Sequence, residues 1–208
     1  MRILVMDMDI IMAPCIKLYN HMTDGDKVSP TEFWNTVNEA IEMEKYLSYD
    51  ANILHSLHRI ILNNPQAHIV SVDYSADVVK DMHMLTSYDK EQFDIVYIGW
   101  HHNASVKHED LSKVIRHSKF KNSNWLGFLL EKDKVNTCQW FKTYNAPNIP
   151  QNQTKFEKID IFPFNKYNEL ELYDIIYIVS SPQWVPYQYQ HFVKFLTDTA
   201  KLQKQKEG

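Results

Sequence analysis

The sequence predicts a three-layer α/β/α domain with a mostly parallel β-sheet, and three observations support this fold class. Short apolar segments alternate with segments of helical periodicity along the 208 residues. Two of the short segments, Phe93–Ile98 and Asp174–Val179, are apolar almost throughout, which is typical of strands buried on both faces. The length fits one domain, and 44% hydrophobic with 23% charged residues is close to the globular average. We therefore expect a single domain over residues 1–208, with a tail that frays from about residue 203.

The N-terminal part of the chain predicts one strand followed by a helix. Residues 2–6 (RILVM) indicate a buried strand that ends at Asp7. The helix is expected to begin after Ser29, because serine caps helices well and Pro30 suits the first helical position. Glu32 completes a capping box with Ser29, and apolar side chains then recur at helical spacing.

The remaining elements alternate in the same way. Asp50 is expected to cap a second helix, which the segment Asn63-Asn64-Pro65 ends. The expected strands that follow cover residues 68–72, 93–98, 137–141, 156–161 and 174–179. The expected helices cover residues 76–85, 108–117 and 123–131, and a last helix begins around Pro186.

Composition excludes several classes of protein. The chain has four glycines and neither a GxxxxGK[ST] nor a GxGxxG motif, which excludes P-loop and Rossmann nucleotide sites. The net charge is −4 without a long basic stripe, so we expect no nucleic-acid partner. No apolar run is long enough for a membrane helix and no signal peptide is evident, so we expect a soluble, cytoplasmic protein. Cys15 and Cys138 provide neither a disulfide framework nor a CxxC metal motif. Lysine far outnumbers arginine, which is typical of an AT-rich genome such as that of a phage.

Ligands of open α/β sheets bind at the carboxyl ends of the strands, so the residues at those ends are the candidate site. Asp7 and Asp9 follow the first strand, and Asp9 stands between apolar neighbours where a carboxylate needs a partner or a metal. The simpler alternative is that Asp7 caps a loop. Asp73 follows the second strand with Asp77 one turn further, and helix capping by Asp73 is an equal alternative.

Histidines follow the third expected strand. In the segment after Gly99, His101 and Asn103 point one way and His102 the other if the chain is extended. Imidazole is the commonest side-chain metal ligand, and an asparagine can add a carbonyl oxygen. A hydrogen-bonded pair of exposed histidines is the alternative. The loop after the last strand, with Ser181 and Trp184, can wall a pocket or anchor the last helix. The predicted pocket rim consists of Trp100, His102, Ser181 and Trp184.

These pieces occur in an order that resembles the bacterial branch of the UPF0489 family, which is related to arginases and histone-deacetylase-like ureohydrolases and includes peptide arginases. The family's Asp-x-Asp after the first strand is matched by Asp7 and Asp9, and its His/Asp-rich turn aligns with Asp73-Tyr74-Ser75-Ala76. Its Asp-x-His-x-Asp motif falls on Gly99, His101 and Asn103. Asn124-Trp125 and the turn with Ser181, Pro182, Trp184 and Pro186 match two further motifs, so the likeness covers most of the chain.

The resemblance implies an arginase/deacetylase-like fold and a metal site held by Asp7, Asp9, His101, Asn103 and Asp73. In this family type, two Mn²⁺ ions activate a hydroxide that attacks a guanidinium carbon. Both carboxylates of Asp-x-His-x-Asp are replaced here, by Gly99 and Asn103, so the motif is degenerate. The remaining ligands fit one divalent cation, Mn²⁺ before others, better than two.

Three functional hypotheses follow. The first is a metal-dependent hydrolase that cleaves a guanidinium or amide C–N bond of a small molecule or peptide. The second is a pseudoenzyme that keeps the fold and binds a protein or a small ligand, and the lost carboxylates favour it. The third is a haloacid-dehalogenase-type phosphatase, suggested by the Asp-x-Asp start. It is disfavoured because Ile10 stands where that family has a small residue and too little chain follows for its lysine and acidic pair. Whether the chain is an enzyme is left open by the sequence.

Overall fold

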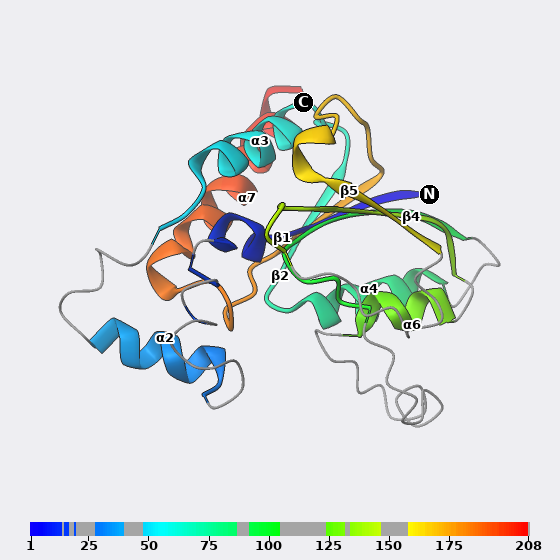
Figure 1. The fold of residues 1–208 in the computed structure, drawn as a ribbon. Helices are drawn as coiled ribbons and strands as arrows, with labels where there is room; N and C mark the ends of the chain where they lie inside the picture. Colours follow the sequence, from blue (N-terminus) through cyan, green and yellow to red (C-terminus); the bar gives the residue numbers. More distant parts are fainter. Residues whose placement is uncertain are drawn as a thin grey trace.

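Six parallel strands form one sheet in the computed structural model, which describes residues 1–13, 15–16, 19, 28–39, 48–86, 92–104, 124–131, 134–146 and 158–207. The strand order is β2-β6-β1-β3-β4-β5, so β1 lies in the interior of the sheet (Figure 1). The strands are β1 (Arg2–Asp7), β2 (His68–Val72), β3 (Phe93–Ile98), β4 (Val135–Lys142), β5 (Ile159–Pro163) and β6 (Ile175–Val179).

Helices cover both faces of the sheet and complete three layers. The α-helices are α2 (Pro30–Glu39), α3 (Ala51–Leu62), α4 (Ser75–Thr86), α6 (Trp125–Glu131) and α7 (His191–Glu207). Short 3-10 helices lie at η1 (Met8–Met12), η4 (Phe164–Lys166) and η5 (Tyr187–Tyr189). Figure 1 shows α3 and α7 on one side of the sheet and α4 and α6 on the other. The predicted three-layer α/β/α class is therefore confirmed.

Two hydrophobic cores follow from the alternation of side chains along the strands. On β1, Leu4 and Met6 pack against the side that carries α3 and α7, whereas Ile3 and Val5 pack against α4 and α6. Trp125, which is fully buried, belongs to the second core. Because β1, β3 and β6 are buried on both faces, their sequences are apolar in nearly every position.

Most element boundaries agree with the sequence-based expectations to within a few residues. The strand Phe93–Ile98 and the start of the helix at Pro30 agree with the prediction. The last helix begins at His191 rather than near Pro186, because Tyr187–Tyr189 forms a 3-10 turn first. It continues to Glu207, past the residue where fraying was expected. The helix expected over residues 108–117 lies outside the described residues, as does the expected strand's start at 156–157.

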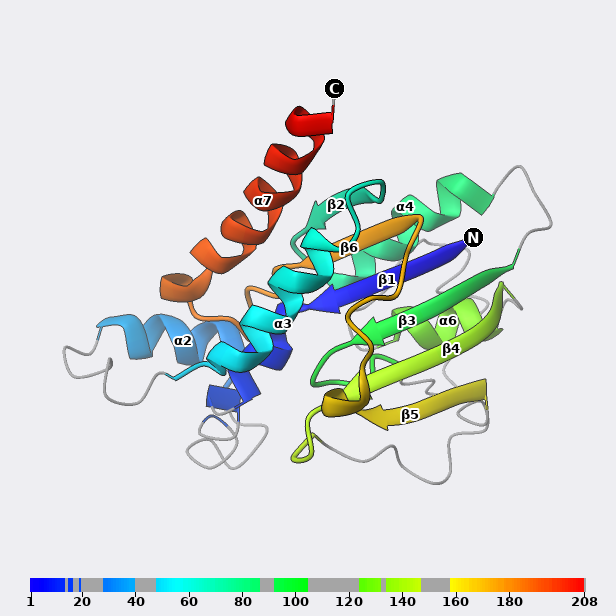
Figure 2. The same cartoon turned by 90° about the horizontal axis from the view of Figure 1, so that it is seen from above.

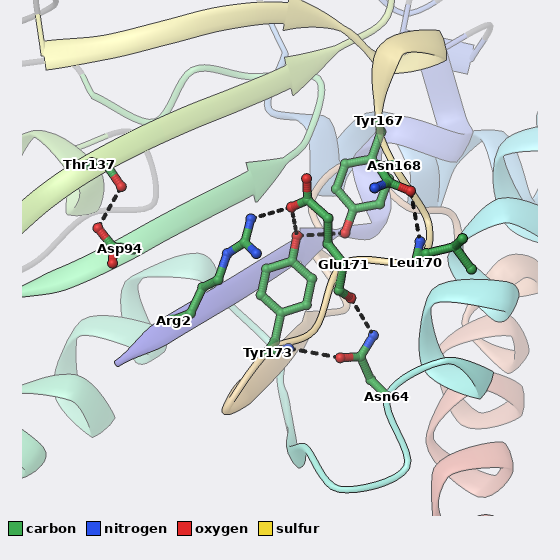
Figure 3. Close-up of polar contacts among 9 residues, drawn as sticks. All are labelled: Arg2, Asn64, Asp94, Thr137, Tyr167, Asn168, Leu170, Glu171 and Tyr173. Atoms are coloured by element: carbon green, nitrogen blue, oxygen red, sulfur yellow. Dashed lines mark hydrogen bonds and ion pairs between the residues drawn. The ribbon is translucent and has the colours of Figure 1, made fainter.

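A polar network fixes the segment that leads from η4 into β6. Glu171 forms an ion pair with Arg2 of β1 and accepts a hydrogen bond from Tyr173 Oη at 3.1 Å. Tyr167 Oη lies 2.7 Å from Tyr173 Oη. The side chain of Asn64 forms two hydrogen bonds with the backbone of this segment (Figure 3). Its Nδ2 donates to Glu171 O, and its Oδ1 accepts from Tyr173 N. The network therefore orients Tyr167 before the chain enters the sheet.

The chain changes sides of the sheet between β1 and β3. After β1 it continues into η1 and α3, on the α7 side, whereas α6, the next described helix after β3, lies on the opposite side (Figure 2). Neighbouring strands whose connections leave in opposite directions create a crevice at their carboxyl ends, where ligands of open α/β sheets bind. Among the described residues, no helix has both the length and the apolar character needed to cross a membrane.

Candidate functional site

Two carboxyl groups are buried at the carboxyl ends of these strands. Asp7 is the last residue of β1 and Asp9 lies in η1, and their exposed fractions are 2% and 1%. Asp7 Oδ1 accepts hydrogen bonds from the Asp9 amide at 3.1 Å and from Ser181 Oγ at 2.6 Å. The first bond caps η1. Asp7 therefore has the capping role that the sequence suggested, and it also lies beside Asp9 and Ser181.

Asp9 links β1 to the segment after β3. Its Oδ1 accepts a hydrogen bond from the Trp100 amide at 2.8 Å, and its Oδ2 lies 2.7 Å from Nδ1 of His101. The His101 ring packs on Trp184 with centroids 4.4 Å apart and an interplanar angle of 34°. With Nδ1 directed at a carboxylate, Nε2 is the ring nitrogen left for other partners, as in carboxylate–histidine pairs at metal sites.

The burial of these groups favours their uncharged forms. Burial raises the pKa of Asp9 to about 7 and holds the pKa of Asp7 well above its usual range, where the neighbouring Asp9 carboxylate raises it further. Burial lowers the pKa of His101 to about 4. Within the described part of the chain, the only ion-pair partner of Asp9 is this weakly basic imidazole. Two buried carboxyl groups without a basic side chain require protons or a bound cation.

The space beside Gly99 is occupied by the side chain of Tyr97. A Cβ atom at residue 99 would lie 2.5 Å from Cζ of Tyr97 and closer still to its Oη. Tyr97 is fully buried, and its Oη accepts a hydrogen bond from Nδ2 of Asn103 at 2.7 Å. Gly99 is therefore required by the close approach of Tyr97, and Asn103 is engaged with the same phenol.

Tyr97 is the site residue that the sequence reasoning missed. It stands in an apolar strand, where an aromatic residue predicts core packing, and its ring does pack edge-on against Trp125 at 5.6 Å. The one feature of the sequence that could have indicated Tyr97 is its position two residues before Gly99, the glycine that follows the expected strand.

The carboxyl end of β2 is separated from this cluster by strand β6. Asp73 is exposed and accepts a hydrogen bond from Ser180 Oγ at 3.1 Å. The Ser181 amide donates to the Asp73 carbonyl at 2.9 Å, while Ser181 Oγ bonds Asp7. Because β6 lies between β1 and β2, Asp73 reaches the carboxylate pair through the two serines.

Of the four residues predicted as a pocket rim, three take part in the cluster directly. Trp100, through its amide, and Ser181 hold the two carboxyl groups, and Trp184 covers His101. The fourth, His102, accepts a hydrogen bond from the Ala104 amide at 3.2 Å, and burial lowers its pKa to about 4.

Backbone strain is concentrated at the same place. Asn103 and Ser181, with φ of 49° and 45°, are the two non-glycine residues of the described chain that have positive φ. Asparagine tolerates this left-handed conformation, whereas serine adopts it less readily. Such strain costs free energy and often marks functional sites. Both residues are buried and both bond to members of the cluster.

The donor set suits one divalent cation better than two. Asp7, Asp9 and His101 provide two carboxylates and an imidazole, which together neutralise one dication. Among the described residues a second ion lacks ligands here, because residue 99 is glycine and the side-chain amide of Asn103 bonds Tyr97. In the present arrangement three carboxylate oxygens carry hydrogen bonds, and no three His, Cys, Asp or Glu residues of the described part converge on one point.

Comparisons with protein-family models, with curated proteins and with solved structures found no match to this chain. The resemblance to arginase-like hydrolases therefore stays a prediction from the ordered motifs.

Proposed function

We propose that one divalent cation binds at the carboxyl ends of β1 and β3, with Asp7, Asp9 and His101 as its protein ligands, and that the chain is a single-ion relative of arginase-like hydrolases. The observation that carries the proposal is the pair of buried carboxyl groups whose one basic neighbour among the described residues is the weakly basic His101 imidazole. Their place at the switch of chain direction and the strained backbone at Asn103 and Ser181 support it.

A bound cation would polarise a substrate and lower the pKa of water, which is the chemistry that hydrolysis of a guanidinium or amide C–N bond requires. The protein groups have separate tasks. Asp9 fixes the orientation of the His101 ring, and Trp184 covers one face of that ring. Ser181 holds Asp7 by donating a hydrogen bond to Oδ1 of its carboxyl group. The substrate class is a small molecule or peptide that carries such a C–N bond.

The second candidate is a binding module without catalysis. It is favoured by Tyr97, whose ring occupies the space beside Gly99 where the family has a carboxylate. A site with one cation, or with protons in its place, would keep the local structure and could bind a protein or a small ligand without cleaving it.

A hydrolysis assay separates the two candidates. The protein is supplied with Mn²⁺, and the release of urea or ammonia is measured for a panel of free and peptide-linked guanidines and amides. The hydrolase proposal predicts turnover that Asp9→Asn reduces by at least about 100-fold. Asp198→Asn, which removes ion pairs with Lys194 and Lys201 at the surface of α7, leaves it unchanged. Mn²⁺ binding without any turnover would instead support the binding module, and absence of both would overturn the cation site.

A further inference from the structure

A cavity of about 550 Å³ opens beyond the carboxyl ends of β4 and β5. Its walls are η4, the turn after β4 and the first residues of α3. None of Asp7, Asp9 and His101 lines it, so it is separate from the proposed cation site. The volume lies within the range of small-molecule sites in proteins, about 300–1,000 Å³.

Two polar side chains of this cavity lack partners within the described chain. Thr143 Oγ1 and Asn145 Oδ1 are buried atoms without a hydrogen bond, and both residues line the cavity. Thr143 is only 8% exposed. A buried hydroxyl or amide oxygen without a partner destabilises the folded state, and most such atoms in native proteins are satisfied. A ligand that donates hydrogen bonds would satisfy both once rotation of the two side chains turns these covered atoms toward the cavity.

Aromatic side chains provide the apolar part of the cavity. Phe164 and Tyr167 have nearly parallel rings, with an interplanar angle of 5°. The Tyr167 ring is fixed by the edge of Phe141 at 5.0 Å and by its hydrogen bond to Tyr173, which Figure 3 shows. Tyr144 lines the same cavity and is 94% exposed, so its ring is available to cover a bound molecule.

The charged side chains that line the cavity each have a polar or charged partner among the described residues. Lys142 Nζ donates to the Ala146 carbonyl at 3.3 Å and lies over the Trp140 ring. Asp50 Oδ1 accepts hydrogen bonds from the first amides of α3, and Glu169 forms an ion pair with Arg59. An uncharged ligand would leave these described contacts in place.

We propose that this cavity binds a small uncharged molecule that joins an aromatic body to N–H donors, such as an aryl amide. The aromatic body packs between Phe164, Tyr167 and Tyr144, and the N–H groups donate to Thr143 and Asn145. The site goes beyond the cation site and does not depend on it.

The test uses the whole protein, labelled with ¹⁵N, and two probes of the same size. Benzamide carries N–H donors, whereas benzoate carries a charge and only acceptors. Benzamide is expected to shift the amide signals of Thr143, Tyr144 and Asn145 saturably, with a Kd of about 1 mM or below, and benzoate is not. Thr143→Val keeps the shape of the side chain and should weaken benzamide binding about tenfold.

Two further variants keep the test interpretable. Tyr144→Ala alters an exposed side chain that folding does not need, and it should also weaken binding. Thr199→Val, whose hydroxyl bonds the Phe195 carbonyl on α7, should leave binding unchanged. The proposal is overturned if benzamide does not saturate by about 10 mM, if benzoate binds equally, or if Thr143→Val and Tyr144→Ala both bind as wild type does.

Discussion

The close approach of Tyr97 to Gly99 predicts that Gly99→Ala is strongly destabilising. The new Cβ would lie 2.5 Å from Cζ of Tyr97, whereas ordinary van der Waals contact begins at 3.4 Å. The Tyr97 ring must therefore move by about 1 Å to restore normal contact. The φ of Gly99 lies outside the left-handed region, so steric overlap rather than backbone conformation sets the cost.

The magnitude follows from two contributions. Overpacking a rigid, fully buried ring costs about 1–3 kcal/mol. The shift also breaks the 2.7 Å hydrogen bond from Asn103 Nδ2 to Tyr97 Oη, and leaving these buried groups unpaired costs about 1–3 kcal/mol. We expect a total loss of about 3 kcal/mol in the free energy of unfolding, which lowers the urea midpoint by about 1–2 M.

A double-mutant cycle in urea isolates the cause. Tyr97→Phe already lacks the hydroxyl and its hydrogen bond, so adding Gly99→Ala to it should cost about 1 kcal/mol less than in wild type. Equal costs in the two backgrounds, or a neutral Gly99→Ala, would refute the argument that Tyr97 fills the space beside Gly99.

Three further predictions concern pH, a helix cap and the cavity. In chelator, the raised pKa of Asp9 makes stability fall as pH rises from about 4 to about 7. The lowered pKa of His101 makes stability rise from about pH 4 to about 6.5, so the two effects oppose each other there. The net decline should appear above about pH 6.5 in urea titrations and be smaller in Asp9→Asn; a midpoint that rises there would contradict it. Asp50→Ala should lower stability by about 1 kcal/mol, because Asp50 caps α3 through two amides, and an unchanged urea midpoint would count against this. Thr143→Val should raise the melting temperature slightly, because it removes a buried hydroxyl without a partner; a lower value would mean that the hydroxyl has one.

Local patterns in the sequence predicted the elements, and their order in the sheet escaped prediction. Phe93–Ile98 was predicted correctly because a strand buried on both faces has an apolar side chain at nearly every position. The insertion of β6 between β1 and β2 is a long-range event, since it pairs Ile175 with both Ile3 and His68. No local pattern carries that information.

The same distinction holds for the site. The sequence indicated Asp7, Asp9 and His101 because each follows an apolar strand. The structure brings them together at the carboxyl ends of β1 and β3. The bond from Ser181 to Asp7 joins residues 174 positions apart, so the sequence offered Ser181 only as part of a rim. Tyr97 was missed because it stands in an apolar strand, where the sequence gives no reason to separate it from the core residues beside it. Its role depends on its contacts with Gly99 and Asn103, which exist only in the folded protein.

The proposed cation site is tested most directly by the metal content of the protein purified without chelator. Elemental mass spectrometry would be applied to wild type, His101→Ala and the control His191→Ala, because His191 is the exposed first residue of α7. The proposal predicts close to one equivalent of Mn, Fe or Zn in wild type and in the control, and a large loss in His101→Ala. Wild-type protein that holds no metal, even after incubation with Mn²⁺, would contradict the proposal.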